Sequence, residues 1–162
     1  MADILVKLYD LCELAPALEK TTANNIVIRR PIGPEKEAIV EWIKTHFHDR
    51  WAYECETAFF NSPKTMYIAI QQGEVPQMLG FACWDATCRN FFGPTGVRED
   101  CRGKGVGNAL LQSCLHAMRD EGYGYAIIGS ASEKARVFYE KSLPASSIWI
   151  PDSKPGVYKN ML

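Results

Sequence analysis

The residues with the clearest chemical potential form a glycine-rich loop that leads into an amphipathic segment. The loop is Arg102-Gly103-Lys104-Gly105-Val106-Gly107, and residues 108–121 follow it with helical spacing. Glycines let a backbone approach an anion closely, and the first amide N–H groups of a helix have no intrahelical acceptor. The helix dipole adds positive character there, and Arg102 and Lys104 add charge. This junction therefore predicts a phosphate-binding site.

The spacing of the glycines separates the known kinds of phosphate loop. A P-loop needs a Gly-Lys-Ser/Thr triplet, whereas Lys104 is followed by Gly105, so that loop is excluded. A dinucleotide fingerprint needs two residues between its second and third glycines and a buried strand directly before the first. Here the glycines alternate and the approach, residues 98–102, is polar. The pattern therefore gives weak support to dinucleotide binding.

Two blocks of the chain resemble the GNAT superfamily of N-acyltransferases. Residues 97–111 look like the family's acyl-CoA signature, whose core is Gln/Arg-x-x-Gly-x-Gly/Ala, and Arg102 to Gly107 match every position of that core. Residues 135–141, Ala-Arg-Val-Phe-Tyr-Glu-Lys, resemble the family's late helix, in which a tyrosine at the position of Tyr139 often faces the CoA sulfur. The resemblance covers most of the chain from about Ile26 onward.

The resemblance implies acetyl-CoA as cosubstrate and assigns residues to it. Amides of residues 102–107 would hold the pyrophosphate, the backbone of Val97 and Arg98 would pair with the pantetheine amides, and a main-chain N–H near Val97 would polarise the thioester carbonyl. Ser132 stands where many members carry an asparagine that contacts CoA. The implied CoA-binding residues are Val97, Arg98, Arg102, Gly103, Lys104, Gly105, Val106, Gly107, Asn108, Ser132, Phe138 and Tyr139.

The catalytic candidates are Tyr139 and Asp85. A phenol with a pKa near ~10 stays protonated at neutral pH and can give a proton to a departing thiolate, so Tyr139 is the candidate general acid. Many GNAT members use a glutamate on a bent strand as general base, but residues 91–97 contain no carboxylate. Asp85, on the neighbouring predicted strand, is the candidate that remains, with a solvated carboxylate as the alternative.

Length and composition restrict the other classes of protein. The 162 residues fit one domain, which we divide into a helical N-terminal extension, 1–24, and a GNAT-like domain, 25–162. A net charge of −1 gives no overall attraction to nucleic acid or to an anionic membrane. The chain shows neither a signal peptide nor a membrane span, which predicts a cytoplasmic protein, and its cysteines and histidines lack metal-binding spacing, so we expect no metal.

The first half of the chain predicts helices around one strand. Residues 3–20 have mostly helical spacing interrupted by Pro16, which indicates an N-terminal helix packed on the domain. Residues 26–30 form a predicted strand, Gly33-Pro34 opens a helix that reaches Phe47, and residues 51–60 form another. By resemblance, this helix pair flanks the acceptor site.

The second half predicts strands around two helices. Residues 67–70, 79–87 and 91–97 are predicted strands, with a bulge or bend at Gly93-Pro94-Thr95-Gly96. After the glycine-loop helix come a strand at 125–129 and a helix for which Ser130 and Glu133 have capping-box spacing. Residues 147–150 and 157–162 are expected to pair as a closing hairpin.

The sequence therefore predicts an α/β fold of the GNAT kind, a mixed and mostly antiparallel sheet with helices on both faces and splayed strands that admit CoA. The expected function is N-acetyl transfer from acetyl-CoA to a primary amine, on a small molecule or peptide, by direct attack in a ternary complex. A non-catalytic acyl-CoA sensor or regulatory module is the alternative, and a nucleotide site for ATP or NAD is a third reading. A homodimer could form through the N-terminal helix or the terminal hairpin.

Overall fold

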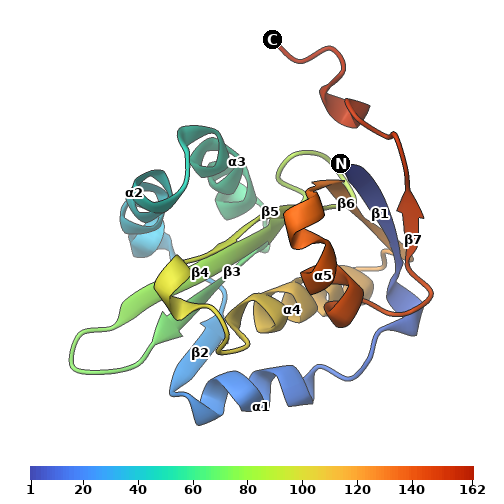
Figure 1. Ribbon diagram of the computed structural model, residues 1–162. Helices are drawn as coiled ribbons and strands as arrows, with labels where there is room; N and C mark the ends of the chain where they lie inside the picture. The colour runs from blue at the N-terminus through green and yellow to red at the C-terminus, as the bar shows by residue number, and fades with distance from the viewer.

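The computed structural model describes all 162 residues, and its framework is one seven-stranded sheet (Figure 1). The strand order is β2-β3-β4-β5-β6-β1-β7, and only the β5–β6 pair is parallel. The strands are β1 (Ala2–Lys7), β2 (Ile26–Arg29), β3 (Met66–Gln71), β4 (Gln77–Trp84), β5 (Phe91–Val97), β6 (Tyr125–Ala131) and β7 (Ile148–Ile150). The predicted mixed, mostly antiparallel sheet is confirmed.

Five α-helices cover the sheet on both faces. They are α1 (Ala15–Ala23), α2 (Lys36–His46), α3 (Asp49–Phe60), α4 (Val106–Asp120) and α5 (Glu133–Ser142). Helices α2 and α3 pack on one face, whereas α4 packs on the other with α1 beside it (Figure 1). None of the helices combines the length and the apolarity needed to cross a lipid bilayer.

The two-residue period of β3 and β4 divides the core between these faces. Ile68 and Phe81 lie in the cluster beneath α2 and α3, whereas their neighbours Ala69 and Ala82 lie in the cluster beneath α4. The α4 cluster also receives the helix's own stripe of apolar residues, including Leu110, which is fully buried. Both faces of the central strands are therefore buried, one beneath α2 and α3 and the other beneath α4.

Strands β5 and β6 pair over only two residues and then part. The paired residues are Phe91 with Ile127 and Phe92 with Ile128. Immediately beyond them, Gly93 and Pro94 of β5 stand opposite the single residue Cys83 of β4, which is the bulge predicted at this glycine-proline segment. The bulge re-aims the rest of β5, so the remainder of the strand pairs with β4 alone.

A second bulge lies at the same level on β6. The pairings of Ala2 with Ala131 and of Ile4 with Ile128 leave Gly129 and Ser130 opposite the single residue Asp3. Ser130 has a φ of 52°, and its N–H donates to Asp3 Oδ1 over 2.7 Å. The carboxylate of Asp3 therefore holds the strand in its bulged form. Strands β5 and β6 thus each carry one extra residue immediately after the last residue pair that joins them.

The first residues differ from their prediction, because Ala2–Lys7 is a strand rather than a helix. β1 pairs with β6 on one side and with β7 on the other, so residues 1–24 contribute to the same sheet as the rest of the chain. Ile4 and Val6 are fully buried, whereas Leu5 and Lys7 are only partly buried, and this two-residue alternation is that of a strand. A helix does follow, but only at Ala15–Ala23.

Two further local predictions are wrong. The closing hairpin does not form, because β7 pairs with β1 and residues 156–158 form a short 3-10 helix instead of a returning strand. Helix α5 is capped by Ser132 and not by Ser130: Ala135 N–H donates to Ser132 Oγ over 3.3 Å, while Ser130 is held in the β6 bulge. In both cases pairing with distant β1 decides the local structure.

An aromatic contact attaches the α2–α3 pair to the free part of β5. Phe47, in the junction between the helices, lies over Gly96, where a Cβ would come within 2.7 Å of Phe47 Cε1. Its ring centroid is 5.3 Å from that of Trp51 and 5.7 Å from that of Phe81, so neighbouring rings restrict its movement. The absence of a side chain at residue 96 therefore sets how closely the helix junction approaches β5.

The Gly96→Ala substitution tests this contact. We expect it to lower the free energy of unfolding by about 1–3 kcal/mol, because the new methyl group overpacks the ring of Phe47. In a Phe47→Ala background the same substitution has space, and its effect should approach zero. A double-mutant cycle by urea denaturation measures the difference. Equal effects of Gly96→Ala in the two backgrounds would show that Phe47 does not set the spacing.

Candidate active site

The glycine loop adopts a conformation that its glycines make accessible. Gly103 has a φ of 87° and Gly105 a φ of 81°, values that side-chain-bearing residues rarely adopt. Residues 102–104 are exposed, whereas the side chain of Val106 is buried in the core and anchors the start of α4. The buried side chain of Val106 therefore fixes the C-terminal end of the loop, while residues 102–104 remain open to solvent.

The amides at the start of α4 remain available to a ligand. Gly105 is the N-cap, and no side chain caps the helix, so the N–H groups of its first turn have no intrahelical or side-chain acceptor. Helix α5 provides the contrast, because Ser132 accepts from Ala135 N–H at its start. The Oγ of Ser132 is thus already used as a cap, and its contact with CoA remains a prediction.

Basic side chains surround these amides. Arg102 is 65% exposed and lies 3.7 Å from the more exposed Glu99, while Lys104 forms no ion pair. Ion pairs exposed to this degree hold their partners weakly. Arg98 is committed more closely to Asp100, with Nε 2.6 Å from Oδ1, and this pair lowers the pKa of Asp100. Arg102 and Lys104 are the cations that the loop offers to an anion.

The end of β5 presents free backbone groups toward the side that β6 has left. Arg98 N–H donates to Leu79 C=O over 2.8 Å, and Arg98 C=O accepts from Cys101 N–H over 3.0 Å. Residues of an antiparallel pair alternate in direction, so the N–H and C=O of Val97 point away from β4. Val97 therefore remains a predicted partner for pantetheine. The N–H and C=O of Arg98, in contrast, already form hydrogen bonds within the protein.

Three predicted site residues from separate elements meet at Gly107. A Cβ at this position would lie 3.5 Å from Phe138 Cε2 and 3.7 Å from Val97 Cγ2. The sequence did not indicate what holds α5 here. Gln112 of α4 donates from Nε2 to the carbonyl of Ser142 over 2.6 Å and thereby ties the end of α5 to α4. The loop, the end of β5 and α5 are therefore brought together as the sequence suggested.

Tyr139 lies inside this assembly with a protonated phenol. Its side chain belongs to the core cluster of α4, and its ring packs edge-to-face on Phe138 with centroids 5.1 Å apart. Burial raises the pKa of Tyr139 to about 12, because ionisation would place a charge in a desolvated site. The residue also lines a cavity of about 190 Å³ between α5 and β7, together with Leu143 and Trp149.

Asp85 is placed elsewhere and serves the turn between β4 and β5. Its Oδ1 accepts from Asn90 N–H over 2.7 Å, and its Oδ2 accepts from the Tyr123 hydroxyl over 2.6 Å. Tyr123 follows the C-terminal end of α4, whereas the glycine loop precedes its N-terminal end, about 22 Å away along a 15-residue helix. Because both carboxylate oxygens already accept hydrogen bonds, we leave Asp85 out of the catalytic group.

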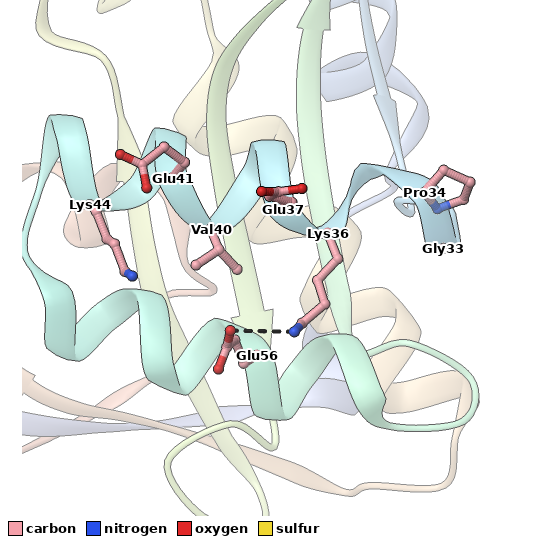
Figure 2. Close-up of a pocket in the computed structure, with 8 residues that line it drawn as sticks. All are labelled: Gly33, Pro34, Lys36, Glu37, Val40, Glu41, Lys44 and Glu56. Carbon is pink, nitrogen blue, oxygen red and sulfur yellow. Dashed lines mark ion pairs between the residues drawn. The ribbon is translucent and has the colours of Figure 1, made fainter.

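A surface groove lies between α2 and α3, away from the loop. It measures about 550 Å³, and its lining carries both signs of charge, as Figure 2 shows for Glu37, Glu41 and Lys44. Lys36 and Glu56 form an ion pair across it, with Nζ 3.4 Å from Oε1. Such a mixed lining gives no preference for a diphosphate. The loop, where free cations and amides coincide, is the better candidate for a diphosphate site.

The family of the chain follows from these features together with its sequence. Residues 62–142 match the family described as the Acetyltransferase (GNAT) domain, a segment that contains β3 to β6, the glycine loop and all of α5. The chain belongs to this family of acetyltransferases. A search of curated protein sequences gives no significant match.

Solved structures support the same fold. One is a GCN5-related glucosamine N-acetyltransferase region of a fungal multi-domain GH3 β-N-acetylglucosaminidase, with 12% identity and a TM-score of 0.72 over 91% of this chain. Another is a GCN5-related N-acetyltransferase from Sphaerobacter thermophilus, with 19% identity and a TM-score of 0.61 over 87% of this chain. The chain spans 19% of the first protein and 47% of the second. The likeness concerns the fold alone.

The two glycines that flank Val106 should respond differently to alanine. Gly105→Ala is expected to lower the free energy of unfolding by about 1–2 kcal/mol, because its φ of 81° is left-handed. Gly107→Ala should leave stability equal or slightly higher, because its Cβ meets ordinary contact distances and alanine favours a helix. Urea denaturation of both variants measures this. Equal losses would contradict the role assigned to the left-handed N-cap.

Proposed function

We propose that the protein transfers an acetyl group from acetyl-CoA to a primary amine, by direct attack of the amine on the thioester in a ternary complex. The observation that carries the proposal is the meeting of three elements at Gly107. This residue belongs to the uncapped start of α4, and Phe138 of α5 and Val97 of β5 lie against it. One extended ligand could contact all three elements in turn.

The nucleotide end of CoA would bind at the glycine loop. The free amides of the first turn of α4, with Arg102 and Lys104 beside them, match a diphosphate in charge and in hydrogen-bonding capacity. This part of CoA does not react. Its binding energy would hold the acetyl group in place and so lower the entropic barrier to transfer.

The pantetheine arm would run along the free edge of β5 in the manner of an added strand. Val97 directs both its N–H and its C=O toward this side, which supports pairing with a pantetheine amide. A donor at this place would also stabilise the negative charge that develops on the thioester oxygen during attack. Such a donor acts most strongly where water is excluded.

Tyr139 would donate the proton to the departing CoA thiolate and regain one from solvent, while the proton that the amine nitrogen loses would pass to solvent. Its phenol is protonated throughout the ordinary pH range, because burial raises its pKa to about 12. We assign no side chain as general base, because Asp85 accepts two hydrogen bonds in the β4–β5 turn and β5 contains no carboxylate. The amine would accordingly attack in its neutral form.

Substitution of Tyr139 by phenylalanine tests the catalytic part of the proposal. We expect kcat for acetyl transfer to fall by about 10²-fold with little change in the KM for acetyl-CoA, because only the proton donor is removed. Release of CoA thiol is followed with a panel of amines that includes glucosamine, polyamines and a lysine peptide. The matched control is Tyr125→Phe, which removes the hydroxyl of a tyrosine 43% exposed to solvent.

The same assay decides between an enzyme and a binding module. Turnover by the wild type that Tyr139→Phe depresses and Tyr125→Phe does not would support acetyl transfer with Tyr139 as the acid. Tight binding of acetyl-CoA without turnover on any amine would favour a non-catalytic CoA sensor. A rise in the melting temperature of the protein with ATP or NAD but not with CoA would support a nucleotide-binding site.

The pKa of Tyr139 also predicts a pH dependence. An acid catalyst loses activity as the pH rises through its pKa, and burial raises that of Tyr139 to about 12. The ratio of kcat for wild type to that for Tyr139→Phe should therefore stay constant from about pH 7 to about pH 10, where a free tyrosine would half ionise. Steady-state rates across this range provide the measurement. A ratio that falls about twofold by pH 10, as an unshifted phenol would give, would contradict a buried phenol whose pKa is raised.

A further inference from the structure

Lys20, from the N-terminal helix α1, lies across the glycine loop. A Cβ at Gly105 would come within 2.9 Å of Lys20 Cδ and 3.2 Å of its Cε, so the aliphatic stem of the lysine rests on the backbone of the loop. The glycine at residue 105 thus has two functions: it permits the left-handed N-cap and it leaves space for this stem. The contact brings a residue 85 positions away in the sequence to the start of α4.

The helix that carries Lys20 is held firmly in this position. Ala17 and Thr21 of α1 are buried, and the helix packs beside α4 (Figure 1). Lys20 lies in the last turn, where its own carbonyl accepts from Asn24 Nδ2 over 2.8 Å. The stem therefore extends from a fixed point, which reduces the entropy that its ammonium group would lose on binding a ligand.

The charge of Lys20 has no partner within the protein. Lys20 forms no ion pair, and neither does Lys104, while Arg102 has only the loose, exposed contact with Glu99. Three cations consequently lie on the loop or across it, at the uncapped start of α4, and only Arg102 contacts an acidic side chain. Like charges gathered around free N–H groups repel one another, and an anion with several negative charges relieves that repulsion.

We propose that Lys20 binds a phosphate group at the nucleotide end of acyl-CoA, as a cation supplied by α1 to the site formed by the loop. The inference rests on the proposed function. CoA offers two kinds of phosphate to such a residue, the diphosphate held by the loop amides and the 3′-phosphate of its ribose. Both would accept a charge-assisted hydrogen bond from the ammonium group.

The test compares Lys20→Met with wild type on three thioesters. Methionine keeps an unbranched stem over Gly105 and removes the charge, Lys20→Arg restores a charge, and Lys159→Met removes one exposed charge from the C-terminal segment as the matched control. The substrates are acetyl-CoA, acetyl-3′-dephospho-CoA and acetyl-pantetheine. We expect Lys20→Met to raise the KM for acetyl-CoA by about fivefold or more, with kcat retained and the change reduced at high salt.

The three substrates locate the phosphate. A defect that disappears with acetyl-3′-dephospho-CoA supports binding to the 3′-phosphate, and a defect that persists there but disappears with acetyl-pantetheine supports binding to the diphosphate. An unchanged KM for acetyl-CoA, a defect equal to that of Lys159→Met, or an equal defect with acetyl-pantetheine would overturn the role of Lys20. A wild type that turns over acetyl-CoA keeps these failures distinct from failure of the proposed function. A wild type that does not bind acetyl-CoA would overturn both.

Discussion

The loss of pairing between β5 and β6 after two residue pairs is the constraint on which the site depends. Backbone N–H and C=O groups need partners, and most of a sheet supplies them internally. Two bulges at one level, at Gly93–Pro94 and at Gly129–Ser130, end this supply and leave the inner edge of β5 free. The uncapped start of α4 adds further donors at the same end of the molecule. A ligand that satisfies these groups can use backbone geometry rather than particular side chains.

The features that the sequence predicted well are local. The helix that follows the glycine loop, its buried stripe and the bulge at Gly93–Pro94 each follow from residues within a few positions of one another. The helix pair α2–α3 and the strands β3 to β6 also follow from local patterns, because the apolar residues of each segment recur with the period of a helix or of a strand. The family signature falls within this part of the chain, which explains why its fold and class could be inferred without a structure.

The features that the sequence did not predict depend on contacts between distant segments. β1 pairs with β6, more than 110 positions later, and although Ile4, Val6 and Leu8 alternate as in a strand, Leu5 and Leu11 also fit a helix. Long separations in the sequence also hide the contact of Asp3 with Ser130, 127 positions apart, and that of Lys20 with Gly105, 85 positions apart. Asp85 illustrates the converse case, because the sequence places a carboxylate near the right strand but does not show that Asn90 and Tyr123 donate hydrogen bonds to it. Side-chain type alone gave no sign of these hydrogen bonds.

The site therefore combines the glycine loop with parts contributed by distant segments of the chain, among them the Asp3-held bulge and α1. The central claim is that free main-chain donors at the start of α4 bind the diphosphate of CoA while the pantetheine arm occupies the gap between β5 and β6. A crystal structure with acetyl-CoA tests it most directly. The account predicts diphosphate oxygens on the amides of residues 103–107 and a pantetheine amide paired with Val97. CoA bound in the α2–α3 groove, or a loop that makes no contact with phosphate, would contradict it.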